Sequence, residues 1–211
     1  MSDILRQVDE DLRKDKLLSI WRSYRFYIIG FILFILISLA SYQYYLSSEQ
    51  SKNEAVVEKY VNALNEKNIN SSINKLIDLD KSGNSYVKGL AKLKRAELYF
   101  INKEKDLALE LLESISNDKS LDKILRDLAL YKYLMVQLDV LDKDLYIQII
   151  DLKDLEESGF KYHFKELKAL KLLIEGDRNN SLQIFESIIS AEDSPIDIII
   201  RAEKFIKISK L

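Results

Sequence analysis

Residues 26–48 read FYIIGFILFILISLASYQYYLSS, and no charged residue interrupts them between Arg25 and Glu49. A helix of about twenty apolar residues, rising ~1.5 Å per residue, crosses the ~30 Å hydrocarbon core of a bilayer. Tyrosine rings, which suit membrane interfaces, lie near both ends of the stretch. A buried helix of a soluble domain is the alternative, but such a helix is rarely apolar on every face. The stretch therefore predicts one transmembrane helix over residues 26–48.

The charges beside this stretch predict its orientation, because lysine and arginine gather on the cytoplasmic side of a membrane helix. The first fifteen residues after position 48 contain only Lys52 and Lys59 as basic residues. We therefore expect residues 1–25 to form a cytoplasmic tail and residues 49–211 to lie on the opposite side of the membrane. The basic residues that set this orientation precede the stretch: Arg13, Lys14, Lys16, Arg22 and Arg25.

A cleaved signal peptide is the alternative to a permanent anchor. Ser38 and Ala40 form a pair of small residues that a signal peptidase could accept, with cleavage after Ala40. However, the leading segment is long and mixed in charge, and the apolar run exceeds the roughly 7–15 residues usual for the core of a signal peptide. We expect an uncleaved signal-anchor.

The amino-acid composition limits which classes of protein remain possible for this chain. The 32 basic and 34 acidic residues nearly balance, so the basic excess typical of nucleic-acid binding is missing. The chain has no cysteine, which excludes disulfides, thiolate metal sites and thiol nucleophiles. With only 5 glycines and 1 proline, an architecture rich in β-turns is disfavoured. Composition predicts an all-α protein.

Apolar stripes at helical spacing recur through residues 49–211. Polar breaks at 65–68, 81–85 and 117–120 separate them, and the break at 81–85 is predicted to be a turn in which Gly83 and Asn84 are able to adopt positive φ. Gly159 is expected to cap the helix before it. The helices are predicted near residues 57–64, 69–77, 86–101, 108–115, 121–138, 146–157, 164–174, 182–189 and 195–209.

Two of the predicted helix pairs share one spacing of small residues. Ala96 and Ala108 lie twelve positions apart, and so do Ala169 and Ser181. A small side chain lets two antiparallel helices approach closely, and helix pairs that recur at a regular period are typical of helical solenoids. We expect a tetratricopeptide-like solenoid of three to four degenerate helix pairs with a C-terminal capping helix. An unspecific helical bundle is the alternative. The bulky partners of the small residues are Tyr99, Leu112, Leu172 and Phe185.

The N-terminal segment carries a family resemblance. Residues 8–16, VDEDLRKDK, and residues 21–24, WRSY, resemble the start of the bacterial YfgM-like family, and the order of tail, anchor and helical domain is similar as well. Arg25 departs from the glycine expected there. The resemblance implies an inner-membrane protein whose tetratricopeptide-like domain faces the periplasm. It also implies association with Sec translocon subunits and with a periplasmic chaperone or secreted chains.

No catalytic constellation can be assembled from the sequence. His163 is the only histidine, and its expected role is a surface or packing one. The carboxylates around residues 139–157 alternate with lysines, which is typical of a solvated surface, and they lack the order of a calcium loop. No glycine-rich phosphate loop or GxSxG elbow is present. We expect no enzyme, cofactor, metal or small-molecule substrate. Four aromatic residues either line a peptide groove or belong to the core: Tyr99, Phe100, Tyr131 and Tyr133.

These observations favour a membrane-anchored scaffold or chaperone adaptor that binds proteins beside the translocon. The alternative with the same fold is a structural tether in envelope or division-site assembly. An anchored enzyme is the alternative from a different class. The stripe of Ile4, Leu5, Val8 and Leu12 predicts a short helix in the tail, which either lies along the bilayer or docks onto a partner.

Overall fold

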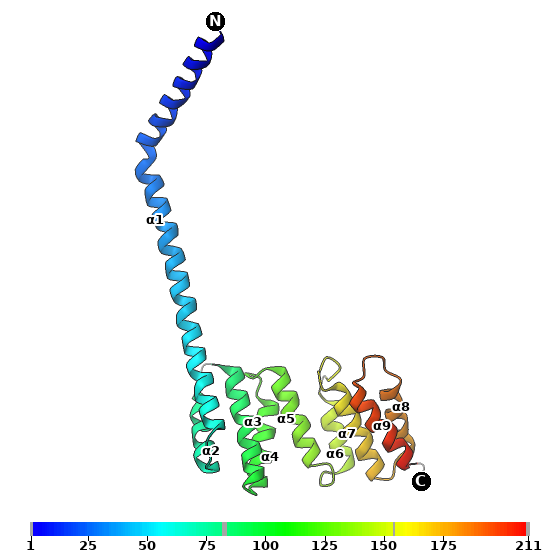
Figure 1. Ribbon diagram of the computed structural model, residues 1–211. Helices are drawn as coiled ribbons and strands as arrows, with labels where there is room; N and C mark the ends of the chain where they lie inside the picture. Colours follow the sequence, from blue (N-terminus) through cyan, green and yellow to red (C-terminus); the bar gives the residue numbers. More distant parts are fainter. Residues whose placement is uncertain (1, 82–83, 154, 210–211) are drawn as a thin grey trace. The chain divides into compact units, whose positions relative to one another are not determined.

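The computed structural model describes residues 2–81, 84–153 and 155–209, and these residues form helices and connections without any strand. The prediction of an all-α protein is confirmed for this part of the chain (Figure 1). Within the first helix, nothing is described of the side chains of residues 2–15, 17–20, 22, 23, 25, 28, 29 and 32. The helices are α1 (Ser2–Leu64), α2 (Ile69–Asp78), the 3-10 turn η1 (Leu79–Lys81), α3 (Ser85–Ile101), α4 (Lys105–Asn117), α5 (Lys123–Val136), α6 (Lys143–Asp151), α7 (Lys161–Ile174), α8 (Arg178–Ile189) and α9 (Ile196–Ser209).

The chain divides into two compact units, Met1–Ala55 and Val56–Leu211. The described part of the first unit belongs to α1, which runs as one helix through the segments predicted as tail and anchor and ends in the second unit, at Leu64. Among the described residues, no helix combines the length and the apolar character needed to cross a membrane. The side chains of Ile28, Ile29 and Ile32, in the predicted anchor, lie outside the description. So do four of the residues expected to set the orientation, Arg13, Lys14, Arg22 and Arg25, whereas Lys16 is exposed.

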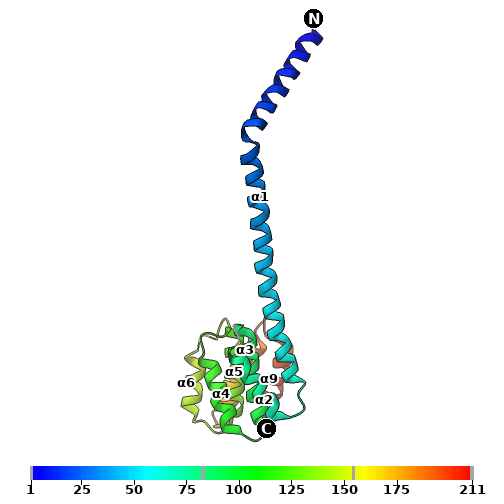
Figure 2. The same cartoon turned by 90° about the vertical axis from the view of Figure 1, so that its left-hand side faces the viewer.

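The second unit is a row of antiparallel helix pairs, α3 with α4, α5 with α6, and α7 with α8, followed by α9 (Figure 1). After a quarter turn these pairs lie behind one another (Figure 2). The first two pairs repeat at one interval along the chain. The start of α5 follows the start of α3 by the same number of residues by which the start of α6 follows the start of α4. The core is divided accordingly, since each buried cluster joins a helix pair to the next helix of the row.

The structure describes two residues that the sequence places at a turn or a helix end, Asn84 and Gly159. Asn84 has φ −89° and caps α3, where its side chain accepts a hydrogen bond from Val87 N–H, and Gly83 lies outside the described residues. Gly159 caps no helix, because α6 ends at Asp151 and the connection to α7 follows. The positive φ angles among the described residues lie at Lys103 (64°) and Gly176 (84°).

The helix predicted over residues 146–157 is displaced, and so is the end of the one predicted over 121–138. Helix α6 begins earlier because the side chain of Asp142 accepts hydrogen bonds from the backbone N–H groups of Asp144 and Leu145. The preceding helix, α5, ends at Val136, so the connection between the two spans residues 137–142.

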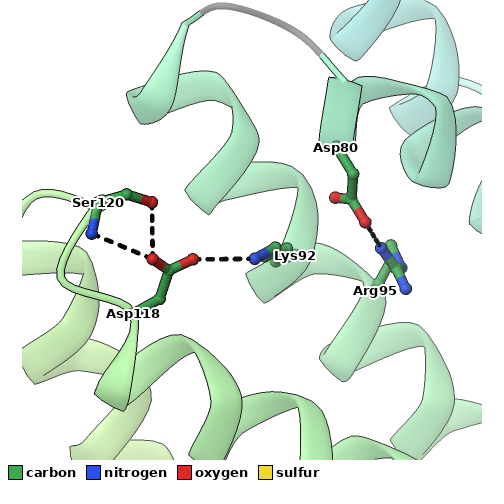
Figure 3. A network of polar contacts seen from close by, with 5 residues as sticks. All are labelled: Asp80, Lys92, Arg95, Asp118 and Ser120. Atoms are coloured by element: carbon green, nitrogen blue, oxygen red, sulfur yellow. Dashed lines mark hydrogen bonds and ion pairs between the residues drawn. The ribbon is translucent and has the colours of Figure 1, made fainter.

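Polar contacts tie the first helices of the row together (Figure 3). Arg95 of α3 donates to Asp80 of η1 at 2.6 Å, and Lys92 of α3 donates to Asp118 at 3.1 Å. Ser120 donates to Asp118 from both its hydroxyl and its backbone N–H. The bonds from Ser120 and the charge of Lys92 lower the pKa of the Asp118 carboxyl to about 2. This network fixes the connection between α4 and α5 against α3.

Candidate functional site

The small residues of the predicted repeat signature lie between paired helices. Ala96 and Ala108 are buried where α3 meets α4, and Ala169 and Ser181 are buried where α7 meets α8. The hydroxyl of Ser181 donates a hydrogen bond to the carbonyl oxygen of Ala169 at 2.8 Å. Among the bulky partners of these small residues, Tyr99 is half-buried. The other three are buried: Leu112, Leu172 and Phe185.

The middle pair uses large residues at the same places, which sequence reasoning missed. Leu134 and Tyr146 follow Ala96 and Ala108 by the same offset that separates the starts of the two pairs, and both are fully buried. The hydroxyl of Tyr146 donates to the carbonyl oxygen of Leu134 at 3.1 Å. With these larger side chains between them, α5 and α6 make no contact comparable to that of α3 with α4 or α7 with α8.

Helices α3, α5, α7 and α9 form a continuous surface, which we call the inner wall. Each contacts the next, whereas α4, α6 and α8 make no comparable contacts with one another among the described residues. The row therefore has its shorter side along the inner wall. Where α3 meets α5, Gly89 leaves room for the side chain of Leu125, since a Cβ atom there would lie 2.6 Å from Cδ1 of Leu125.

An aromatic cluster lies where α5 meets the start of α7. The ring of Tyr131 lies 5.3 Å from His163 and 6.1 Å from Phe160, measured between centroids, and 6.2 Å from Phe164. Phe160 and His163 are 5.4 Å apart. The Nδ1 atom of His163 is buried and has no hydrogen-bond partner within the described part of the chain. The cluster thus combines apolar surface with an unused polar group, and its histidine packs as the sequence led us to expect.

A charged group adjoins this cluster along the inner wall. The guanidinium of Arg201 in α9 donates two hydrogen bonds to the carboxylate of Glu166 in α7, at 2.7 and 2.9 Å, and a third to Asp197 at 3.0 Å. These bonds raise the pKa of Arg201. Burial, with the negative charge of Glu166, raises the pKa of Tyr131. The hydrogen bonds between Arg201 and Glu166 therefore link the last two helices of the wall.

The inner-wall helices also carry large exposed apolar side chains outside the aromatic cluster and the ion pair. Ile101 and Ile174 occupy equivalent positions near the ends of α3 and α7, and Met135 follows Tyr131 by one turn of α5. All three are more than half exposed. By contrast, the other aromatic residues considered for a groove are half-buried and pack against core clusters: Tyr99, Phe100 and Tyr133.

The chemistry of this surface follows from the side chains that it exposes. It offers aromatic and aliphatic side chains and one fixed ion pair. The described residues contain no group of three or more histidine, aspartate or glutamate side chains that could hold a metal ion. Comparisons with protein-family models, curated proteins and solved structures found no match to this chain.

Proposed function

We propose that this protein is a membrane-anchored scaffold whose unit Val56–Leu211 binds partner proteins along the inner wall. The observation that carries the proposal is the wall itself, in which α3, α5 and α7 present exposed Ile101, Met135 and Ile174 and the aromatic cluster lies where α5 meets the start of α7. Exposed apolar surface of this kind, rimmed by charges, is typical of protein-binding sites. In this proposal the helix pairs are degenerate tetratricopeptide-like repeats and α9 is the cap.

Residues 26–48 of α1 serve as the anchor in this proposal. Large side chains in this stretch are strongly exposed in several directions around the helix, including Phe26 (71%), Tyr27 (75%) and Phe34 (68%). Leaving such a surface in water is costly, at ~25 cal/mol per Å² of apolar area, whereas lipid tails remove the cost. With basic residues before the stretch, the N-terminus lies in the cytoplasm and Val56–Leu211 in the periplasm of a bacterial cell.

The resemblance of residues 8–16 and 21–24 supports a place beside the Sec translocon. Anchoring there holds the inner wall close to emerging chains or to a periplasmic chaperone. Because a tethered site meets its partner at a high effective concentration, individually weak contacts suffice.

The experiment is affinity capture of the tagged full-length chain from membranes in mild detergent, read by mass spectrometry. The inner-wall variant carries Met135→Asp and Ile174→Asp, at two positions that are more than half exposed, so the new charges remain in contact with solvent. The matched control carries Leu107→Asp and Leu145→Asp, which are similarly exposed on α4 and α6. A third variant has residues 26–48 exchanged for an unrelated membrane helix.

Translocon subunits and a chaperone or secreted chains should be enriched with the wild type and the control. We expect the inner-wall variant to lose the chaperone or secreted chains, and the exchanged helix to lose the translocon subunits. Equal capture by the inner-wall variant and its control would contradict binding through the wall. Envelope or division proteins captured equally with both membrane helices would replace the translocon role by a tether.

A further inference from the structure

A groove lies on the opposite face of α7 from the inner wall. Its volume is about 610 Å³, and it is bordered by the end of α6, the connection to α7, α7 itself and α8. The cause is the length of α6, which has nine residues where α4 has 13 and α8 has 12. About one helical turn is therefore missing from the outer layer at this place. We call this feature the α6–α8 groove.

The floor of the α6–α8 groove is apolar. Phe164 and Ile150 line it, and both also belong to the core cluster between α5, α6 and α7. Leu155, from the connection, is buried beside them, and Ile184 of α8 closes the far side. A floor of this kind accepts an apolar side chain and gives a bare inorganic anion little to bind.

The rim of the groove is basic. Lys161, Lys165 and Lys168 follow one another at spacings of four and three residues, so they form one stripe along α7. This stripe faces away from His163 and Glu166, which belong to the inner wall. Lys153 adds a fourth cation from the other lip.

Only part of this charge is neutralised within the protein. Lys161 pairs with Glu156 and Lys168 with Asp151, each at 2.7 Å, and both pairs join the two lips. Between them, Lys165 forms no ion pair with any described residue, and its Nζ lies 5.5 Å from the centroid of the Tyr162 ring. Lys153 donates to the neutral amide oxygen of Asn117 at 3.2 Å. Among the described residues of the lining, the lysines therefore exceed the carboxylates by two.

We propose that the α6–α8 groove binds an acidic peptide segment of a partner protein. One large apolar side chain of the segment packs against Leu155 and Ile184, and flanking carboxylates pair with Lys165 and Lys153. The lysine stripe extends over about two turns of α7, about 10 Å, which matches carboxylates spaced along a peptide better than the single charge of a small anion. Asp151 and Glu156 on the rim disfavour a uniformly anionic surface such as a membrane. This site is separate from the inner wall and does not rest on the proposed function.

The proposal is tested with the full-length chain in a non-ionic detergent and a fluorescent probe peptide, Glu-Asp-Phe-Asp-Glu, followed by anisotropy. A second peptide with Ser in place of Phe tests the floor. Lys165→Glu should weaken binding of the first peptide about five- to tenfold, as expected for a lost and reversed charge contact. The control, Lys105→Glu, lies on α4 outside the groove and should leave binding unchanged.

A gain of binding separates recognition from loss of structure. The double variant Asp151→Asn, Glu156→Gln releases Lys168 and Lys161 from their internal partners, and we expect it to bind the peptide several-fold more tightly. Equal affinity for the Phe and Ser peptides, or no effect of Lys165→Glu relative to Lys105→Glu, would overturn the proposal. So would binding to phosphatidylglycerol vesicles, lost with Lys165→Glu, in the absence of peptide binding.

Discussion

Tyr146 donates a hydrogen bond from its hydroxyl to the carbonyl oxygen of Leu134, at 3.1 Å. In the next pair, Ser181 makes the same connection to Ala169 at 2.8 Å. Two side chains of very different size thus link the same two places of successive helix pairs. The larger one fills the space between α5 and α6, which stay apart, and the smaller one lets α7 and α8 touch.

Two substitutions of Tyr146 distinguish how much its hydrogen bond and its side-chain volume each contribute to the free energy of unfolding. We expect Tyr146→Phe to lower the free energy of unfolding by about 1 kcal/mol, because one buried hydrogen bond is lost. Tyr146→Ser places the residue type of position 181 in the middle pair, yet it should cost about 3–5 kcal/mol through the cavity it leaves. Urea unfolding followed by circular dichroism measures both. Tyr86→Phe, at a half-exposed site, is the control and should be nearly neutral.

The lowered pKa of Asp118 gives a pH dependence of stability. Because the folded pKa, about 2, lies below the ordinary value of 3.8, the protein binds this proton less readily when folded. The stabilisation by Asp118 is therefore complete above about pH 5 and is lost as the pH falls through about 4 towards 2. The difference in melting temperature between the wild type and Asp118→Asn should shrink over that range. For Asp139→Asn, at an exposed position, a difference that shrank equally would contradict the role of Asp118.

The turn inside the first helix pair and the turn inside the third each contain one residue with a left-handed backbone conformation. Lys103 (φ 64°) and Gly176 (φ 84°) both lie seven positions after the small residue of their pair. A side chain is strained in this conformation, so Lys103→Gly should raise the free energy of unfolding by about 0.5 kcal/mol. Gly176→Ala should lower it by about 1 kcal/mol through backbone strain alone, since no atom lies within 4 Å of the new Cβ. Thermal unfolding that showed the two changes acting in the same direction would refute this.

The ion pair of Glu166 and Arg201 is predicted to be asymmetric. Glu166 is 4% exposed, so Arg201→Met leaves a buried carboxylate without its two hydrogen bonds and should cost about 2–3 kcal/mol. The side chain of Arg201 is 40% exposed, which keeps the cost below that of a fully buried pair. The double variant Glu166→Met, Arg201→Met should be more stable than Arg201→Met alone, as measured by urea unfolding. Asp197→Asn, which breaks only the exposed pair, should cost less than about 1 kcal/mol.

The helical architecture could be predicted because local signals agree with it. Apolar stripes, few glycines and one proline all indicate helices, and the spacing of Ala96 to Ala108 located the pair α3–α4. The helices of the middle pair were predicted, but its repeat spacing was not recognised because Leu134 and Tyr146 replace the small residues. The signal that could have found them is their separation from each other, which equals that of Ala96 from Ala108.

The end of α6 and the aromatic cluster of the inner wall could not be predicted from the pattern of apolar residues along the sequence. Leu152 and Leu155 extend the apolar pattern of α6, but both follow its end at Asp151, with Leu155 buried in the connection. The aromatic cluster brings Tyr131 of α5 next to His163 of α7, and such proximity depends on how the pairs stack. Spacing along one helix carries no information about that stacking.

Single-cysteine labelling tests the anchored arrangement most directly, because the natural chain has no cysteine. Ser2→Cys probes the tail, and Lys119→Cys probes an exposed site between α4 and α5. Both variants should remain in the membrane fraction after carbonate extraction. In intact spheroplasts, a membrane-impermeant maleimide should label Lys119→Cys, and it should label Ser2→Cys only after permeabilisation. Extraction into the soluble fraction, or protection of both sites in intact spheroplasts, would contradict a helical unit held on the periplasmic side by residues 26–48.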